Sequence, residues 1–236
     1  MANSDMRQTE IDRIKAEYER RRKEIPKDFY SLEHSGNLFI YLDRVRKVIE
    51  ALKRELFSPL AGKEILEIGY GTGDWIVDFA RWGAESKKLH GVELDEVRAQ
   101  KAQKRIPSAD LRVGEASKLP WPDNYFDLVL QSTVFTSILN DSFKRAIAKE
   151  MLRVLKPEGF ILWYDFRFNN PNNPNVRGIE MNEIRSLFPD CHFQFQKITL
   201  APPIARWLAP YSWLACYLLE KISFLRTHYL VVIKKT

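Results

Sequence analysis

Glycines and carboxylates alternate in one short stretch of the chain, residues 64–75, in a pattern suited to binding a small ligand. Gly69, Gly71 and Gly73 follow a β-prone apolar run and precede a helix-like segment, which predicts a buried strand, a tight turn and a helix. Glycines let the backbone approach a ligand closely, and the free N–H groups of a helix start point into the same space. The stretch therefore predicts a nucleotide-binding turn.

The charges around this turn restrict the nucleotide. Glu67 lies in the apolar run and Asp74 begins the helix, so a pyrophosphate would be repelled. The spacing is G-x-G-x-G, whereas the dinucleotide fingerprint is G-x-G-x-x-G. S-adenosylmethionine (SAM) fits better, because it has no phosphate and carries a sulfonium and an ammonium. An NAD-dependent oxidoreductase stays open as an alternative, because Glu93 in the next apolar run suits the ribose hydroxyls of either cofactor.

Four sequence blocks follow one another over roughly residues 60–167: ILEIGYGTG, GVELD, VGEASKLPWPDNYFDLVLQS and EMLRVLKPEGFILWYDF. In this order and spacing they resemble the class I SAM-dependent methyltransferases, in the broad group that includes the ubiquinone and menaquinone methyltransferases. The resemblance implies SAM as the cofactor. It also implies cofactor contacts at Glu67, Gly69, Tyr70, Gly71, Gly73, Glu93, Leu94, Glu115, Ala116 and Gln131.

Three of these residues have more specific expected roles. Glu115 is expected to accept a hydrogen bond from the adenine amine, and the backbone N–H of Ala116 to serve a ring nitrogen. Tyr70 replaces a residue that is usually small in the family, and we expect it to narrow the mouth of the cofactor or acceptor site.

Strand and helix signals alternate from residue 65 to residue 164, which predicts a doubly wound α/β fold with ligands outside the carboxyl ends of the strands. The resemblance implies a mostly parallel seven-stranded sheet with helices on both faces and a C-terminal antiparallel hairpin, expected at 193–200 and 229–233. Residues 1–58 are expected to form an N-terminal helical cap or lid. Residues 59–236 are expected to form the SAM-binding domain, with the fifth strand at 160–164 and a helical insertion at about 201–226.

The insertion APPIARWLAPYSWLACYLLEKISFLR is the stretch that departs most from the family's plan. Its uncharged part, 207–219, contains Pro210 and is too short to span a bilayer. We expect it to roof a partly apolar acceptor site; a homodimer contact and a peripheral membrane contact are the alternatives.

Acceptor chemistry has few candidates in the sequence. His34, Asp165 and His228 are candidate bases, although the sulfonium is already activated and a base is needed only for a weakly nucleophilic acceptor. Asp165 is expected to begin an irregular loop in which Arg167 or Arg177 holds an anionic acceptor. No metal site is predicted.

Composition limits the remaining possibilities. The 236 residues are 45% hydrophobic and carry a net charge of +6, which suits one globular α/β domain. Two cysteines without metal-ligand spacing, and no signal peptide, predict a cytoplasmic protein with reduced thiols.

The sequence therefore predicts in-line methyl transfer from SAM to an oxygen, nitrogen or carbon nucleophile of a small-molecule or lipid- or glycan-like acceptor. RNA or protein methylation is the alternative. The strand that ends in Gln131-Ser132-Thr133 lacks the N/D-P-P-[FYW] signature of many enzymes that methylate amino groups in nucleic acids and proteins, so nucleic acid is not an expected partner.

Overall fold

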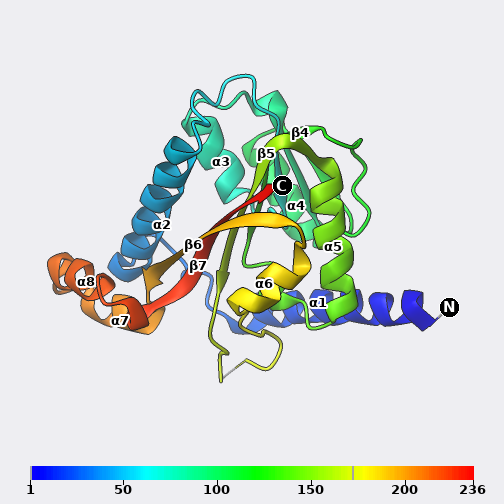
Figure 1. Ribbon diagram of the computed structural model, residues 1–236. Helices are drawn as coiled ribbons and strands as arrows, with labels where there is room; N and C mark the ends of the chain where they lie inside the picture. The colour runs from blue at the N-terminus through cyan, green and yellow to red at the C-terminus, as the bar shows by residue number, and fades with distance from the viewer. Residues whose placement is uncertain (1, 172) are drawn as a thin grey trace.

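A seven-stranded sheet forms the centre of the computed structural model, which describes residues 2–171 and 173–236 (Figure 1). The strands are β1 Ile65–Ile68, β2 Leu89–Glu93, β3 Asp110–Val113, β4 Phe126–Ser132, β5 Leu155–Phe166, β6 Cys191–Leu200 and β7 Arg226–Lys235. Their order in the sheet is β3-β2-β1-β4-β5-β7-β6. Strands β1 to β5 pair in parallel, whereas β7 is antiparallel to both β5 and β6. The predicted mostly parallel sheet with an antiparallel C-terminal pair is confirmed.

Helices cover both faces of this sheet. They are α1 Ala2–Glu24, α2 Ser35–Arg54, α3 Asp74–Arg81, α4 Glu96–Arg105, α5 Asp141–Val154, α6 Met181–Leu187, α7 Pro202–Leu208 and α8 Trp213–Glu220, with short 3-10 turns at Ser86–Lys88, Phe135–Ser137 and Ser223–Leu225. One apolar core joins the sheet to α2, α3 and α4, and a second joins the opposite face to α1, α5 and α6. No helix in the described part of the chain is long and apolar enough to cross a membrane.

The central strand β5 shows how the sequence supplies both cores. Ile161 and Trp163 belong to the core on the α5 side, whereas Leu162 and Tyr164 belong to the core on the α2 side. Successive side chains of a strand point to opposite faces, so a strand buried on both sides must be apolar almost throughout. This is why the run reads as continuously hydrophobic.

Strand β5 is longer at both ends than the predicted 160–164. It begins at Leu155, which pairs with Phe126, and a register irregularity follows between Phe126 and Leu128. The irregularity coincides with Pro157, which has no N–H to give to the ladder. At the other end Asp165 pairs with Tyr229, so the expectation that Asp165 begins an irregular loop was wrong.

Helix α1 lies along the edge of the sheet where the parallel strands end (Figure 1). It is one continuous helix of 23 residues within the expected N-terminal helical segment. Ile11 and Ile14 are buried in the core on the α5 side, and polar side chains of α1 reach the loops that follow β2, β3, β4 and β5. The helix therefore closes the edge at which ligands of this fold class bind.

Candidate cofactor and acceptor site

The glycine turn connects β1 to α3 and requires glycine for two separate reasons. Gly69, Gly71 and Gly73 have φ values of 67°, 56° and 81°, in the left-handed region that other residues rarely adopt. A Cβ atom on Gly71 would also lie 2.3 Å from Nη2 of Arg98, and one on Gly69 would lie 2.5 Å from Cγ2 of Val134. The turn is thus shaped for close approach, as the sequence predicted.

Glu93 holds this turn against β2. Its Oε2 accepts a hydrogen bond from the Gly71 N–H at 2.8 Å, and its Oε1 accepts one from the Asp95 N–H at 2.9 Å. The carboxylate is buried, and the guanidinium of Arg98 lies 3.9 Å away. Glu93 therefore has a structural task that the sequence did not reveal, beside its predicted role toward the ribose.

Glu67 is a buried carboxyl group with an unused oxygen. Its Oε2 has no hydrogen-bond partner among the described residues. Burial, reinforced by the charges of Asp74 and Glu93, raises the pKa of Glu67 well above its ordinary value. A buried, unpaired acid in acidic surroundings is stabilised by a cation, so the site fits the ammonium of SAM and disfavours a pyrophosphate.

A cavity of about 50 Å³ lies beside the turn. Five of the predicted cofactor residues line it: Gly69, Glu93, Leu94, Glu115 and Ala116. They come from the carboxyl ends of β1, β2 and β3, so the parallel strands bring together residues that are far apart in the sequence. Ile14 and Tyr18 of α1 complete the lining, which places the predicted N-terminal lid directly against this group.

Ion pairs and hydrogen bonds fasten α1 over the cavity. Arg22 pairs with Asp95, and Arg7 lies 3.3 Å from Oε1 of Glu115. On the far side of the cavity, Arg13 donates to the carbonyl of Ser137 at 2.6 Å. The same carboxylate that is predicted to bind adenine is therefore paired with a helix of this chain.

Five of the predicted cofactor residues do not line the cavity: Glu67, Gly71 and Gly73 of the segment described above, and also Tyr70 and Gln131. Tyr70 is buried in the core on the α2 side, packs against Gly91 and donates to the carbonyl of Arg112 at 3.4 Å. The expectation that its side chain narrows a site mouth was wrong, because the left-handed residue before it turns the ring back toward β2 and β3. Gln131 is fully buried, and its Oε1 accepts from the Val134 N–H at 3.1 Å, so it braces the loop after β4.

The three candidate bases have unrelated surroundings. His34 is exposed in front of α2, with its Nε2 3.7 Å from Asp28, and lines neither cavity described here. His228 is buried and stacked on Tyr164 at 4.8 Å between ring centroids, and burial together with Arg44 lowers its pKa to about 3. A neutral imidazole of such low basicity is a poor proton acceptor.

Asp165, the third candidate base, is held by hydrogen bonds from Thr136. It is fully buried, and its Oδ1 accepts from Oγ1 of Thr136 at 2.5 Å while its Oδ2 accepts from the Thr136 N–H at 3.2 Å. Burial raises its pKa to about 7 against the lowering effect of these hydrogen bonds. A carboxyl group with a pKa near neutrality can exchange a proton at physiological pH.

Two arginines that the sequence analysis did not select also belong to this region. Arg44 of α2 lies over the rings of Trp75 and Tyr164, at 4.8 and 5.5 Å, and its buried Nε has no hydrogen-bond partner among the described residues. Arg98 lies over the ring of Tyr18 at 4.8 Å. Both lie on helices, and the pattern of apolar and polar residues along a helix carries no signal for an inward-pointing arginine.

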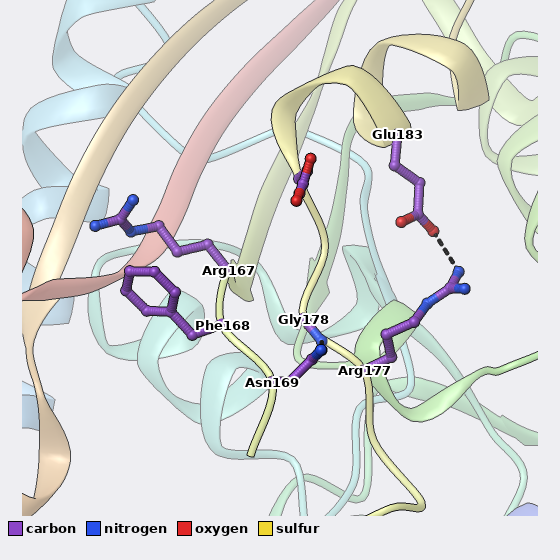
Figure 2. A pocket seen from close by; sticks show the side chains of 7 residues that line it. Arg167, Phe168, Asn169, Arg177, Gly178 and Glu183 are labelled. Carbon is purple, nitrogen blue, oxygen red and sulfur yellow. Dashed lines mark hydrogen bonds and ion pairs between the residues drawn. The ribbon is translucent and has the colours of Figure 1, made fainter. Parts of the chain in front are cut away.

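A second, more polar cavity of about 380 Å³ lies where β5 passes into the loop before α6 (Figure 2). Arg167, Phe168, Arg177 and Glu183 line it, and Figure 2 shows Arg177 directed toward Glu183, at 3.0 Å. Because Arg177 pairs with both Glu183 and Asp141, much of its charge is already compensated. The backbone N–H of Arg177 donates to the carbonyl of Thr136, which connects this cavity to the residue that holds Asp165.

The insertion between β6 and β7 does not line either of these two cavities. Trp207 is 71% exposed, and Trp213 is 40% exposed with its ring edge against Phe39. Only a small cluster, including Ala205, Ala209 and Cys216, is buried beneath it. The structure therefore does not support the expected roof over an acceptor site.

Comparisons with known proteins match the part of the chain that holds the glycine turn. A family model described as a methyltransferase domain matches residues 65–159. The ubiquinone/menaquinone biosynthesis C-methyltransferase UbiE of Paraburkholderia phymatum is 34% identical over 109 residues, which are 44% of this chain and 44% of that protein. The enzyme of the same name from Azotobacter vinelandii is 31% identical over 125 residues, 50% of this chain and 47% of that protein. The chain thus spans about half the length of these curated relatives.

Solved structures extend the likeness to most of the fold. PH0226 protein of Pyrococcus horikoshii OT3 has a TM-score of 0.56 at 19% identity, covering 81% of this chain and 91% of that chain. Phosphoethanolamine N-methyltransferase 1 of Haemonchus contortus, in complex with phosphoethanolamine and S-adenosylhomocysteine, has a TM-score of 0.63 at 14% identity, covering 97% of this chain and 49% of that chain. At these identities the likeness concerns the fold.

Proposed function

We propose that this chain, whose central part is a class I SAM-dependent methyltransferase domain, transfers the methyl group of SAM to a small-molecule or lipid-like acceptor. The family match supports the resemblance that the four sequence blocks predicted. SAM supplies an activated methyl group, so the protein's contribution is to align the two reactants and to exclude water.

The observation that carries this proposal is the unpaired carboxyl group of Glu67 beside the glycine turn. In the proposed complex Glu67 holds the ammonium group, Glu93 the ribose hydroxyls, and Glu115 with Ala116 the adenine. Three carboxylates near one turn, Glu67, Asp74 and Glu93, suit a cation and oppose the pyrophosphate of NAD.

Asp165 is the proton acceptor in this proposal where the acceptor needs one. Its pKa of about 7 suits removal of a proton from a weakly acidic hydroxyl group, and Thr136 fixes the carboxyl group by two hydrogen bonds. The cavity of Figure 2 is linked to this pair through the backbone N–H of Arg177, which donates to the carbonyl of Thr136, and it offers Arg167 and Asn169 to the polar part of an acceptor. The relatives named as ubiquinone/menaquinone biosynthesis C-methyltransferases favour a carbon nucleophile among the three kinds of acceptor atom.

Binding and turnover test the proposal in two steps. In the first step, SAM and S-adenosylhomocysteine should raise the melting temperature in proportion to the logarithm of their concentration, whereas NAD should leave it unchanged. In the second step, methyl-labelled SAM is incubated with phenolic and quinol lipids, with amino alcohol phosphates, and with RNA. Label transfer to a small molecule without added RNA supports the proposal, and stabilisation by NAD alone contradicts it.

A further inference from the structure

Helix α8 exposes large apolar side chains and buries a carboxylate, unlike an ordinary surface helix. Trp213, Leu214, Tyr217 and Leu218 are 40%, 68%, 45% and 58% exposed, whereas Glu220 on the other side is 3% exposed. A surface helix normally directs its apolar stripe inward and its charges toward water. In α8 Cys216 and Leu219 pack inward in the small cluster beneath the insertion, four further apolar side chains face outward, and the carboxylate of Glu220 faces the protein.

The exposed apolar surface continues on both sides of α8. Trp207 at the end of α7 is 71% exposed, Tyr211 in the turn before α8 is 82% exposed, and Phe224 after α8 is 72% exposed. We call these residues, together with the four from α8, the aromatic face. Contiguous apolar surface of this kind marks an interaction site in a folded protein.

The accessible charged side chains of residues 201–226 are basic. Residues 201–226 contain four charged side chains, Arg206, Glu220, Lys221 and Arg226, and Glu220 is the buried one. Lys221 is exposed and its Nζ lies 4.1 Å from the ring centroid of Tyr217. Lys221 therefore supplies an accessible positive charge beside exposed apolar side chains, and such a charge is attracted to an anionic lipid surface.

The position of the aromatic face in the fold suits binding to a flat lipid surface rather than binding to a peptide. Helices α7 and α8 project from the body of the protein beside the N-terminal end of α2, at the same end of the sheet as α1 (Figure 1). The aromatic face lines neither of the two described cavities, and a peptide ligand would need a groove. A second copy of this chain would offer Lys221 no accessible carboxylate from residues 201–226.

We propose that the aromatic face binds peripherally to a bilayer that contains anionic lipids. Trp207, Tyr211 and Phe224 enter the headgroup region, Leu214 and Leu218 contact the acyl chains, and Lys221 pairs with lipid phosphates. Such docking places the carboxyl edge of the sheet, with its two cavities, near the membrane surface. The proposal does not depend on methyl transfer, because it concerns binding alone.

Flotation with vesicles tests the proposal without any cofactor. The protein is mixed with vesicles of equal parts phosphatidylglycerol and phosphatidylcholine, or of phosphatidylcholine alone, and the bound fraction and tryptophan emission are measured. We expect binding with a blue shift on the anionic vesicles, weakened by salt. The absence of binding to anionic vesicles, or equal binding to both kinds, overturns the proposal.

Two variants of exposed residues locate the contact. Leu214→Ser with Leu218→Ser should reduce the partition coefficient about tenfold or more, because two leucines no longer leave water. Leu56→Ser with Val97→Ser, which changes two exposed apolar residues outside the insertion, should leave it unchanged. Lys221→Glu should reduce it about fivefold or more on anionic vesicles.

The melting temperatures of the wild type and the variants are compared first, so that a loss of vesicle binding is not mistaken for a loss of folding. Sedimentation velocity over a range of protein concentrations then tests whether a second copy of the chain covers the aromatic face instead. If the wild-type protein dimerises and the Leu214→Ser, Leu218→Ser variant is monomeric while vesicle binding is absent in both, a second copy covers the face and the proposal is overturned.

Discussion

The ring of Tyr18 in α1 lies 4.8 Å from the guanidinium of Arg98 in α4. Arg98 in turn lies against Gly71 and Glu93, so this contact joins the N-terminal helix to the glycine turn. The cavity left beside it is about 50 Å³, and Ile14 and Tyr18 of α1 line it. We therefore expect α1 or the Arg98 side chain to move when the proposed cofactor enters.

The ion pair between Arg22 and Asp95 is the contact at which this movement can be tested. Partly exposed ion pairs contribute up to about 1 kcal/mol, so Arg22→Gln should accelerate the association of S-adenosylhomocysteine about two- to fivefold. Stopped-flow tryptophan fluorescence measures the rate. Lys23→Gln is the matched control, because Lys23 pairs with Glu19 within the helix. Equal association rates for the wild type and Arg22→Gln would show that α1 does not limit entry.

Glu67→Gln should weaken SAM binding by about 1.5–3 kcal/mol, since a charge-assisted hydrogen bond to the ammonium is lost. The raised pKa of Glu67 adds a pH dependence: the free protein holds this proton to a higher pH than an ordinary carboxyl group does, and a bound cation favours the ionised form, so binding releases protons. Affinity of the wild type should therefore increase with pH until the ammonium of SAM itself deprotonates near about pH 8. Calorimetric titrations of both proteins should show this increase in the wild type alone; a parallel pH dependence in the variant would remove Glu67 from the site.

Glu93→Gln tests the second carboxylate. Glutamine retains one acceptor oxygen but presents an NH₂ group to one of the two N–H donors, Gly71 or Asp95, so stability should fall by about 1–3 kcal/mol. The binding free energy of SAM should separately weaken by about 1.5–3 kcal/mol if the ribose hydroxyls bind here. Glu96→Gln, at the exposed start of α4, is the control for the charge change. A folded Glu93→Gln protein with unchanged SAM affinity would place the ribose elsewhere.

Asp165→Asn should change the pH dependence of stability in a defined direction. The pKa of Asp165 is raised from 3.8 to about 7, so the folded protein holds this proton more tightly than the unfolded chain does. The stability that this group gives the wild type is fully present below about pH 4 and is lost as the pH rises to about 7. At about 1.4 kcal/mol per pKa unit, the loss amounts to at most about 4 kcal/mol. Asparagine cannot ionise, so the variant should gain stability relative to the wild type over this window.

Chemical denaturation at a series of pH values gives the difference between the two proteins, in which the titration of all other groups largely cancels. Methyl transfer is measured in parallel at about pH 7.5, where the wild-type carboxyl group is mostly ionised. A constant difference in unfolding free energy from acidic to neutral pH would show that Asp165 has an ordinary pKa. Undiminished methyl transfer by Asp165→Asn would exclude it as the base.

Several parts of the fold and site were predictable because they depend on local pattern. The run before Gly69 is apolar because β1 is buried on both faces, and the glycines are needed by φ angles that the turn imposes. The resemblance to methyltransferases implied that Glu93, Leu94, Glu115 and Ala116 share one site, and the parallel strands do bring them to the same edge of the sheet.

Other parts were wrong or invisible for an equally physical reason. The direction of the Tyr70 ring, the orientation of α8 and the inward side chains of Arg44 and Arg98 depend on which surfaces meet after folding. Periodicity shows that a helix has an apolar side but does not say whether that side meets a core, a ligand or a membrane.

The sequence by itself therefore determined the α/β architecture, the glycine turn and the acidic character of its surroundings, since strand burial, left-handed φ angles and charge are properties of residues and their neighbours. Only the tertiary structure decided that Glu67 is unpaired, that Asp165 is buried against Thr136, and that α1 closes over the cofactor residues. Each of these depends on contacts between segments far apart in the chain, and burial in those contacts sets both the pKa values and the space available to a ligand.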